Sequence, residues 1–421
     1  MAISDETADS MIRFANNSVS VVNRVEEAEL SVYLAKDKRR AIASTSNLRA
    51  VAVKKFVRDL FASMKGIPLS EYAPLPDKKT RYSPSRFGFD RRLEDVDDNL
   101  PRFAKSAIDS ALAAGGKRSA GVVSAGKATV AILTSTGTRG RDARTAITLN
   151  VRSFAENEAS GHGLSCSSNL AGFHPEEAGR RAGEGAKKMR NSSEPEAGKY
   201  DVLLSPTVAS NIVETVADAA SAFSVDAGTS YLADKVGKKV AAPNFNLTDH
   251  GVVEGGLGGR VFDDEGNATR SNKIIDDGIL IRYLHNLTTA KKWKTQSTGN
   301  AGFVTPHPWN LEVGKGDSTY GEMVKEMKKG VILTSNWYTR FKNYRTGEFS
   351  TVPRDGAYLV ENGEVVKSLK GMRAGDDLER FLSSVRLLSR EREWIQWWEV
   401  GTPTLCPWVL VEGVNITRAY G

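Results

Sequence analysis

Two turn-forming dipeptides in the second half of the chain restrict the folds that it can adopt. Asp277-Gly278 and Asn362-Gly363 each stand between two runs of alternating apolar and polar residues. Both dipeptides readily take the positive φ angles that a two-residue β-hairpin requires, and alternating runs are typical of half-buried strands. The second half is therefore predicted to consist mainly of antiparallel strands, with the last strand within residues 408–417.

The first half mixes strand and helix patterns. Residues 18–44 alternate like strands and residues 47–64 follow a helical period, which predicts a small sheet backed by a helix. Residues 128–155 hold two β-rich runs around a glycine-containing loop and predict a long hairpin. Pro175 begins a second helical pattern, and Ser205 is placed to cap a third. We therefore predict an α+β protein: an N-terminal α/β sheet-and-helix domain, then a strand-rich C-terminal domain with a curved or barrel-like antiparallel sheet.

The length of 421 residues indicates two or three domains. Residues 66–92 carry four prolines and two glycines, a composition typical of a connecting loop. We expect an N-terminal sheet-helix subdomain with its linker in residues 1–92, a middle hairpin-helix subdomain in residues 93–196, and the C-terminal strand-rich domain in residues 197–421.

Composition favours a globular protein of the cytoplasm. Hydrophobic residues make up 40% and charged residues 26% of the chain. The first residues show neither a basic nor an apolar leader pattern, and no uncharged apolar run of about 18 residues occurs, so no membrane span is expected. Cys166 and Cys406 are the two cysteines. Their wide separation supports neither a disulfide framework nor a zinc knuckle.

The net charge of +7 raises the question of nucleic-acid binding. Basic residues cluster in residues 36–40 and 78–92, but no known RNA-binding or zinc-finger signature accompanies them. Solvated surface charge is the favoured interpretation. A basic nucleic-acid-binding scaffold stays as an alternative.

Residues 255–266, "GGLGGRVFDDEG", combine glycines with three consecutive acids. A phosphate-binding loop would need a lysine and a following helix, and neither pattern is present. Asp263, Asp264 and Glu265 cannot all converge on one ion from an extended backbone. We interpret the segment as a turn with solvated carboxylates.

Histidine is too scarce for a typical zinc peptidase helix. Such a helix carries two histidines and a glutamate that reach one metal ion, and none of the five histidines forms such a set. His162 and Cys166 are four residues apart, but the flanking glycines argue against a helix. A self-sufficient metallopeptidase with an atypical metal site using His162, Cys166 or His250 stays as an alternative.

Several segments together resemble the TldD/PmbA family. They are "GKYDVLLSP", "GTSYLADKVGKKVAAPNFNLTD", "GGRVFDDEGNATRSNKIIDDGILIRYLHNLTTAKKW", "STGNAG", "TGEFS", "AYLVENGEVV" and "WVLVEGVNIT". The resemblance implies a two-domain subunit that dimerises around an enclosed cleft and acts on unfolded peptides. It also implies a choice between two branches: TldD, with zinc held by an HExxxH helix and a later cysteine, and TldE or PmbA, which lacks these ligands and serves as the partner.

The matching positions resemble the second branch. The corresponding helix, "SPTVASNIVETVADAASA", contains no histidine. Glu214 and Asp218 share one of its faces, which we interpret as a solvated edge because two carboxylates alone make a poor zinc site. The segment "SREREWIQWWEVGTP" lacks the later cysteine. The resemblance therefore implies a chain with no catalytic or metal-binding residue and no cofactor of its own, with zinc in a TldD-like partner, although a homodimer stays possible.

Residues 334–350 are the predicted contact with an unfolded peptide substrate. Aromatic faces can hold an extended peptide, and interleaved cations suit its carboxylates. A strand pair with a polar outer face is the alternative interpretation. The predicted contact residues are Trp337, Tyr338, Arg340, Phe341, Tyr344 and Arg345.

Overall fold

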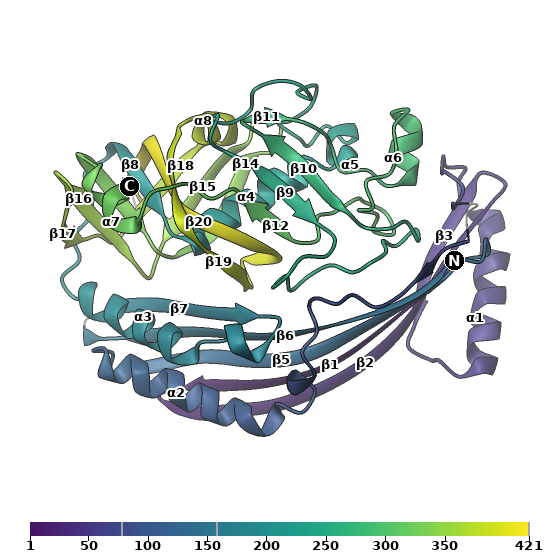
Figure 1. The fold of residues 1–421 in the computed structure, drawn as a ribbon, viewed down its shortest axis with the longest axis horizontal. Coiled ribbons are helices and arrows are strands. Elements are labelled where there is room, and N and C mark those ends of the chain that lie inside the picture. Colours follow the sequence, from purple (N-terminus) through teal and green to yellow (C-terminus); the bar gives the residue numbers. More distant parts are fainter. Residues whose placement is uncertain (77–78, 157–158, 420–421) are drawn as a thin grey trace.

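The computed structural model describes residues 1–76, 79–156 and 159–419, so Lys78 of the second basic cluster lies outside the described residues. Figure 1 shows two layers, with a long curved sheet below and a second body of strands and helices above it. The predicted α+β class is confirmed. No helix in the described ranges is long and apolar enough to cross a membrane.

The lower layer is a seven-stranded sheet with the order β3-β2-β1-β5-β6-β4, and β7 pairs with β6. β1 pairs with both β2 and β5, so it joins strands from either side of residue 92 in one sheet. The predicted hairpin of residues 128–155 is confirmed as β5 and β6. The strands are β1 (Ala2–Ala15), β2 (Ser18–Lys36), β3 (Arg39–Thr45), β4 (Arg81–Tyr82), β5 (Arg118–Leu133), β6 (Arg139–Phe154) and β7 (Ser160–Ser167).

Helices α2 (Leu100–Ala113) and α3 (Pro175–Lys188) cover one end of this sheet, where α3 packs on β6 and β7. Close packing depends on glycine. A Cβ atom at Gly163 of β7 would lie 1.8 Å from the carbonyl oxygen of Ala178 in α3. This contact explains why a sequence rich in glycine and alanine forms a tightly packed helix and sheet.

Helix α1 (Ala50–Ser63) is the helix predicted to back the sheet, and it contacts β3 and β2 as predicted, although it buries no residue against them. It stands at the β3 end of the sheet, none of its residues is buried, and Val51 is 82% exposed (Figure 1). A helical period in the sequence shows that a helix is amphipathic, but it does not show which surface its apolar face meets.

The upper layer contains a 13-stranded open sheet, mostly antiparallel, in which β8–β13 and β12–β20 are parallel pairs. Its strands are β8 (Gly198–Leu204), β9 (Leu247–His250), β10 (Ser271–Asp276), β11 (Ile279–Leu280), β12 (Leu311–Val313), β13 (Lys329–Leu333), β14 (Asn336–Asn343), β15 (Glu348–Pro353), β16 (Ala357–Glu361), β17 (Glu364–Ser368), β18 (Met372–Asp377), β19 (Val385–Trp397) and β20 (Val400–Arg418). Both predicted hairpins are confirmed: Asp277 has φ 47° and Asn362 has φ 49°.

Helix α4 (Pro206–Ala219) lies in the core of the upper layer. Ser205 caps it as predicted, because its hydroxyl accepts a hydrogen bond from the amide of Val208. Val208, Ile212 and Val216 face the core and are at most 2% exposed. Shorter helices complete the layer: α5 (Ala222–Asp226), α6 (Leu287–Lys292), α7 (Tyr320–Lys325) and α8 (Leu378–Ser383).

The glycine and acid segment forms a turn, but its carboxylates are not solvated as predicted. Asp263 is fully buried and accepts hydrogen bonds from the amides of Asn267 at 2.8 Å and Ala301 at 3.2 Å. Asp264 is paired with Arg260. A buried carboxylate is tolerated here because several amide donors satisfy it.

Candidate functional site

The segment predicted to contact peptide forms a hairpin at the margin of the upper sheet. β14 pairs with β15, and no second partner strand of β14 occurs among the described residues, so one edge of β14 is open. The register shifts between Trp337 and Arg340, where Tyr338 has φ 56°. A bulky residue in the left-handed region is strained. The Tyr338 amide donates a hydrogen bond to the Glu399 carboxylate at 2.9 Å.

Two of the six predicted contact residues, Trp337 and Tyr338, form an aromatic cluster with Trp397 and Trp398. Neighbouring ring centroids in the cluster lie 5.1–6.4 Å apart, and Trp398 is 55% exposed. A third predicted residue, Arg340, places its guanidinium 5.2 Å from the centre of the Tyr338 ring. The cluster therefore presents aromatic faces and a cation beside the open edge of β14.

The half-buried indole of Trp337 also connects the two layers. Its Nε1 donates a hydrogen bond to Asp355 at 3.1 Å, and the Arg354 guanidinium lies 4.8 Å from its ring centre. Asp355 is buried, accepts a hydrogen bond from Ser160 at 2.6 Å and pairs with Arg152 at 2.6 Å. Because Ser160 and Arg152 belong to the lower sheet, Asp355 is a point of attachment between the layers.

The other three predicted contact residues lie towards α4. Phe341 and Tyr344 stack with ring centroids 5.3 Å apart and line a cavity of about 470 Å³, while Arg345 is exposed in the following turn. We call this cavity the α4 pocket. Its walls also include Asn211, Thr215, Asp218, Ser224, Thr229, Tyr231 and Thr339. The six predicted residues are therefore divided between the aromatic cluster, the α4 pocket and the turn.

The two carboxylates of α4 do not form a simple solvated edge. Glu214 is half-buried and accepts a hydrogen bond from the amide of Thr402 at 2.6 Å, and burial raises its pKa. Asp218, in contrast, is exposed and lines the α4 pocket. The prediction of a solvated edge is therefore wrong for Glu214 and confirmed for Asp218.

The donor groups of α4 do not suit zinc. Zinc sites in proteins are built from imidazole, thiolate and carboxylate groups that converge, whereas α4 offers Glu214, already bonded to an amide, and Asp218. Across the three described ranges, no three histidine, cysteine, aspartate or glutamate side chains are grouped to hold a metal ion.

The residues of the alternative metal site are not brought together. His162 and Cys166 lie on β7, where four residues span roughly 13 Å, which is too far for two ligands of one ion. The Cys166 thiol donates a hydrogen bond to the carbonyl of Trp394, and burial raises its pKa to about 12. His250 lies in the other sheet, on β9, beside Glu312 at 3.1 Å.

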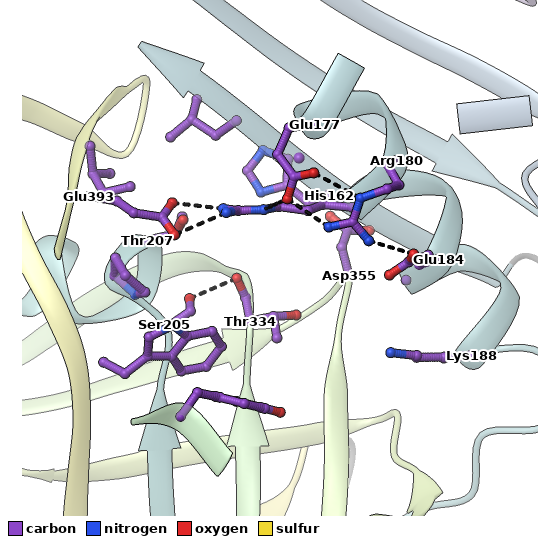
Figure 2. Close-up of a pocket in the computed structure, with 18 of the residues that line it drawn as sticks. His162, Glu177, Arg180, Glu184, Lys188, Ser205, Thr207, Thr334, Asp355 and Glu393 are labelled. Carbon is purple, nitrogen blue, oxygen red and sulfur yellow. Dashed lines mark hydrogen bonds and ion pairs between the residues drawn. The ribbon is translucent and has the colours of Figure 1, made fainter. Parts of the chain in front are cut away.

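A second cavity, of about 380 Å³, lies between the two layers (Figure 2). Arg180 of α3 pairs there with Glu177 at 2.7 Å and with Glu184 at 2.5 Å, and Arg181 reaches Glu393 of the upper layer at 2.7 Å. The Arg180 guanidinium lowers the pKa of Glu177 to about 2. These charged side chains already pair with one another. We therefore interpret the ion pairs beside this cavity as structural, with Arg181 and Glu393 joining the two layers.

Comparison with known proteins identifies similar domains and chains. Residues 197–418 match the PmbA/TldA metallopeptidase C-terminal domain, and residues 84–190 match the PmbA/TldA metallopeptidase central domain. The chain is 31% identical over 206 residues to the metalloprotease MJ0996 of Methanocaldococcus jannaschii, covering 47% of this chain and 44% of that protein. It is 32% identical over 168 residues to the metalloprotease PmbA of Escherichia coli O157:H7, covering 40% and 36%.

The match to these two curated relatives thus spans less than half of either relative's length. The fold is similar over a greater length to that of a solved structure. TldE from Thermococcus kodakarensis superimposes with a TM-score of 0.86 at 20% identity, covering 99% of this chain and 96% of that chain. At this identity the likeness establishes the fold.

Proposed function

The chain belongs to the PmbA/TldD metallopeptidase family, and from this premise we propose that it is the non-catalytic subunit of a two-subunit zinc peptidase that acts on unfolded peptides. The observation that carries the proposal is the donor set of α4. In this family a zinc-carrying subunit would need an HExxxH helix, whereas α4 has Glu214 and Asp218 without an imidazole. Zinc is then supplied by a TldD-like partner.

The open edge of β14 supports a role in peptide binding. An extended peptide can add to a strand edge through its backbone, whatever its sequence. The aromatic cluster of Trp337, Tyr338, Trp397 and Trp398 lies at this edge and offers apolar contact, while Arg340 can meet carboxylates of the peptide. We assign β14 to the wall of the shared cleft.

Exposed valines on β2 support assembly with a second subunit. Val19, Val21, Val22 and Val25 are between 39% and 73% exposed, and residues 18–27 are all exposed. Val19 and Val22 lie on one face of β2 and Val21 and Val25 on the other, so exposed apolar side chains flank this part of the strand on both faces. Exposed apolar surface is typical of a protein interface. We assign this part of β2 to the contact with a TldD-like subunit, with a homodimer as the other arrangement.

Zinc content and peptide turnover test the proposed function directly. The isolated chain is expected to contain far less than one zinc per chain and to leave unfolded peptides uncut, because α4 lacks the required ligands. Mixing it with a zinc-carrying relative from the same genome is expected to give peptide turnover. About one zinc per isolated chain together with turnover would instead establish a self-sufficient metallopeptidase.

The interface assignment predicts that Val22→Glu weakens assembly. A carboxylate placed in an apolar contact must lose its hydration, and we expect the dissociation constant of the complex to rise about tenfold or more. Analytical ultracentrifugation of the mixed subunits measures this. Val366→Glu, which makes the same change at an exposed valine of β17 outside the assigned contact, is the control, and equal effects of the two variants would contradict the assignment.

A further inference from the structure

We propose that the Glu399 carboxylate is a latch on the open edge of β14: it occupies the Tyr338 amide that a peptide strand would use, and the peptide must displace it to bind along the whole strand. The inference rests on the proposed function, because it concerns how the peptide-binding edge of β14 is regulated. Its basis is a strained bulge in β14 and the contacts that hold this bulge in place.

The latch is a hydrogen bond between two hairpins of the upper layer. Glu399 lies in the turn between β19 and β20, where Trp397 pairs with Val400. Its carboxylate accepts a hydrogen bond from the Tyr338 amide at 2.9 Å. In a β-ladder a peptide carbonyl oxygen accepts such a bond, and a carboxylate is the stronger acceptor because it is charged. Glu399 therefore takes the place of the backbone of an added strand.

The Glu399 carboxylate can leave this position without a change in the turn that carries it. The side chain is half-buried, and no ion pair to it occurs among the described residues. The backbone of the turn is held separately, because the Glu399 carbonyl accepts a hydrogen bond from the side-chain amide of Asn211 in α4 at 2.5 Å. Rotation of the side chain alone therefore releases the Tyr338 amide.

The conformation of the bulge favours this release. Tyr338 has φ 56°, and a bulky residue in the left-handed region is disfavoured. The register of β14 with β15 is interrupted between Trp337 and Arg340, so Tyr338 does not continue the ladder. An extended Tyr338 would remove the strain and give β14 a continuous edge. The cost of a left-handed residue and the strength of a hydrogen bond to a charged acceptor are similar in size, so the latched and released conformations are closely balanced.

The change is confined to the bulge, because both of its ends are fixed. Asn336 is fully buried, and its side-chain amide donates to Asn211 at 3.0 Å. Arg340 pairs with β15 again, so only residues 337–339 lie between the two fixed positions. The Tyr338 ring lies 6.0 Å from the ring of Trp398, which neighbours Glu399 in the same turn. Release of the bulge would therefore also separate these two aromatic faces and make room for a peptide between them.

Removal of the carboxylate tests the latch in the assembled complex. We expect Glu399→Ala to lower the KM of an unstructured, capped decapeptide about tenfold, because the apparent affinity rises with the fraction of molecules that have an open edge. Glu399→Gln keeps the size of the side chain but has a neutral acceptor, and it should lower the KM about threefold. Glu391→Ala, at an exposed glutamate of β19 in the same hairpin, is the matched control and should leave the KM unchanged. Thermal unfolding checks that each variant is folded.

Hydrogen exchange of the Tyr338 amide tests the same bond in the isolated chain. Mass spectrometry of overlapping peptides isolates the exchange of this amide. We expect it to exchange about tenfold faster in Glu399→Ala than in the wild-type chain, because an amide that has lost its acceptor is less protected. Glu391→Ala should again have no effect.

The outcomes separate the latch from the proposed function. An equal or higher KM for the folded Glu399→Ala complex would overturn the latch while leaving the peptidase role intact, because the carboxylate would then be neutral for peptide binding or would support it. Unchanged exchange of the Tyr338 amide in Glu399→Ala would also overturn it, because the hydrogen bond would not exist in solution. Failure of the complex to cut any peptide would refute the proposed function and, with it, the inference.

Discussion

Replacing Asp355 with alanine is expected to lower the free energy of unfolding by about 3–5 kcal/mol. Asp355 is buried and receives hydrogen bonds from Ser160 and Trp337 as well as the ion pair with Arg152. Alanine would leave the Arg152 guanidinium without a counter-ion and would leave two donors unpaired. Removing one member of a buried pair is costly because the remaining charge stays desolvated.

Urea unfolding followed by far-ultraviolet circular dichroism measures this effect. Glu393→Ala is the matched control, because Glu393 also pairs across the layers, with Arg181, but both side chains of that pair are more than a third exposed. An exposed ion pair contributes at most about 1 kcal/mol. If the two variants lose the same stability, Asp355 is not the attachment point that its burial indicates.

The elements that could be predicted from the sequence are those fixed by neighbouring residues. Asp277-Gly278 and Asn362-Gly363 form hairpins because their own backbone preferences match the turn. Ser205 caps α4 because its hydroxyl reaches an amide three residues later. In these cases the interacting groups lie within a few residues of each other, so the pattern in the sequence contains both partners.

The features that the sequence did not reveal depend on distant partners. Asp263 receives one hydrogen bond from Ala301, 38 positions later, besides its local bonds, and buried Asp355 receives hydrogen bonds from Ser160 and Trp337. Hydrophobic periodicity does not show whether a given polar residue is buried. Because most aspartates are exposed, the sequence alone favours exposure for both residues. The shallow packing of α1 on β2 and β3 could not be predicted for the same reason, since the extent of a helix's contact is set by the tertiary fold.

The candidate site shows the same difference between features set by neighbouring residues and features set by distant ones. The segment of residues 334–350 can be recognised as a candidate contact from the sequence, because its aromatic and basic residues lie close together in the chain. Asp218 and Tyr231 line one cavity from different segments, and no local pattern in the sequence brings them together. The helical spacing of Asp218 from Glu214 indicates a shared face, but the hairpin that closes the pocket beside Asp218 cannot be placed from the sequence.

The two ends of the predicted contact segment are expected to respond differently to truncation. Tyr344→Ala should lower kcat/KM of the assembled complex about tenfold, because Tyr344 is 56% exposed and stacks with Phe341 at the pocket wall. The free energy of unfolding should change by less than about 0.5 kcal/mol, as is usual for an exposed residue.

Trp337→Ala is the contrasting variant, because the Trp337 indole donates to buried Asp355 and its ring centre lies 4.9 Å and 4.8 Å from the guanidinium groups of Arg152 and Arg354. We expect it to lower the free energy of unfolding by about 1–3 kcal/mol as well as turnover. Urea unfolding and peptide turnover, measured on both variants in the assembled complex, distinguish contact with peptide from support of the fold. Unchanged turnover with Tyr344→Ala would remove the α4 pocket from the cleft, whereas normal turnover by a folded Trp337→Ala complex would restrict peptide contact to the pocket end of the segment.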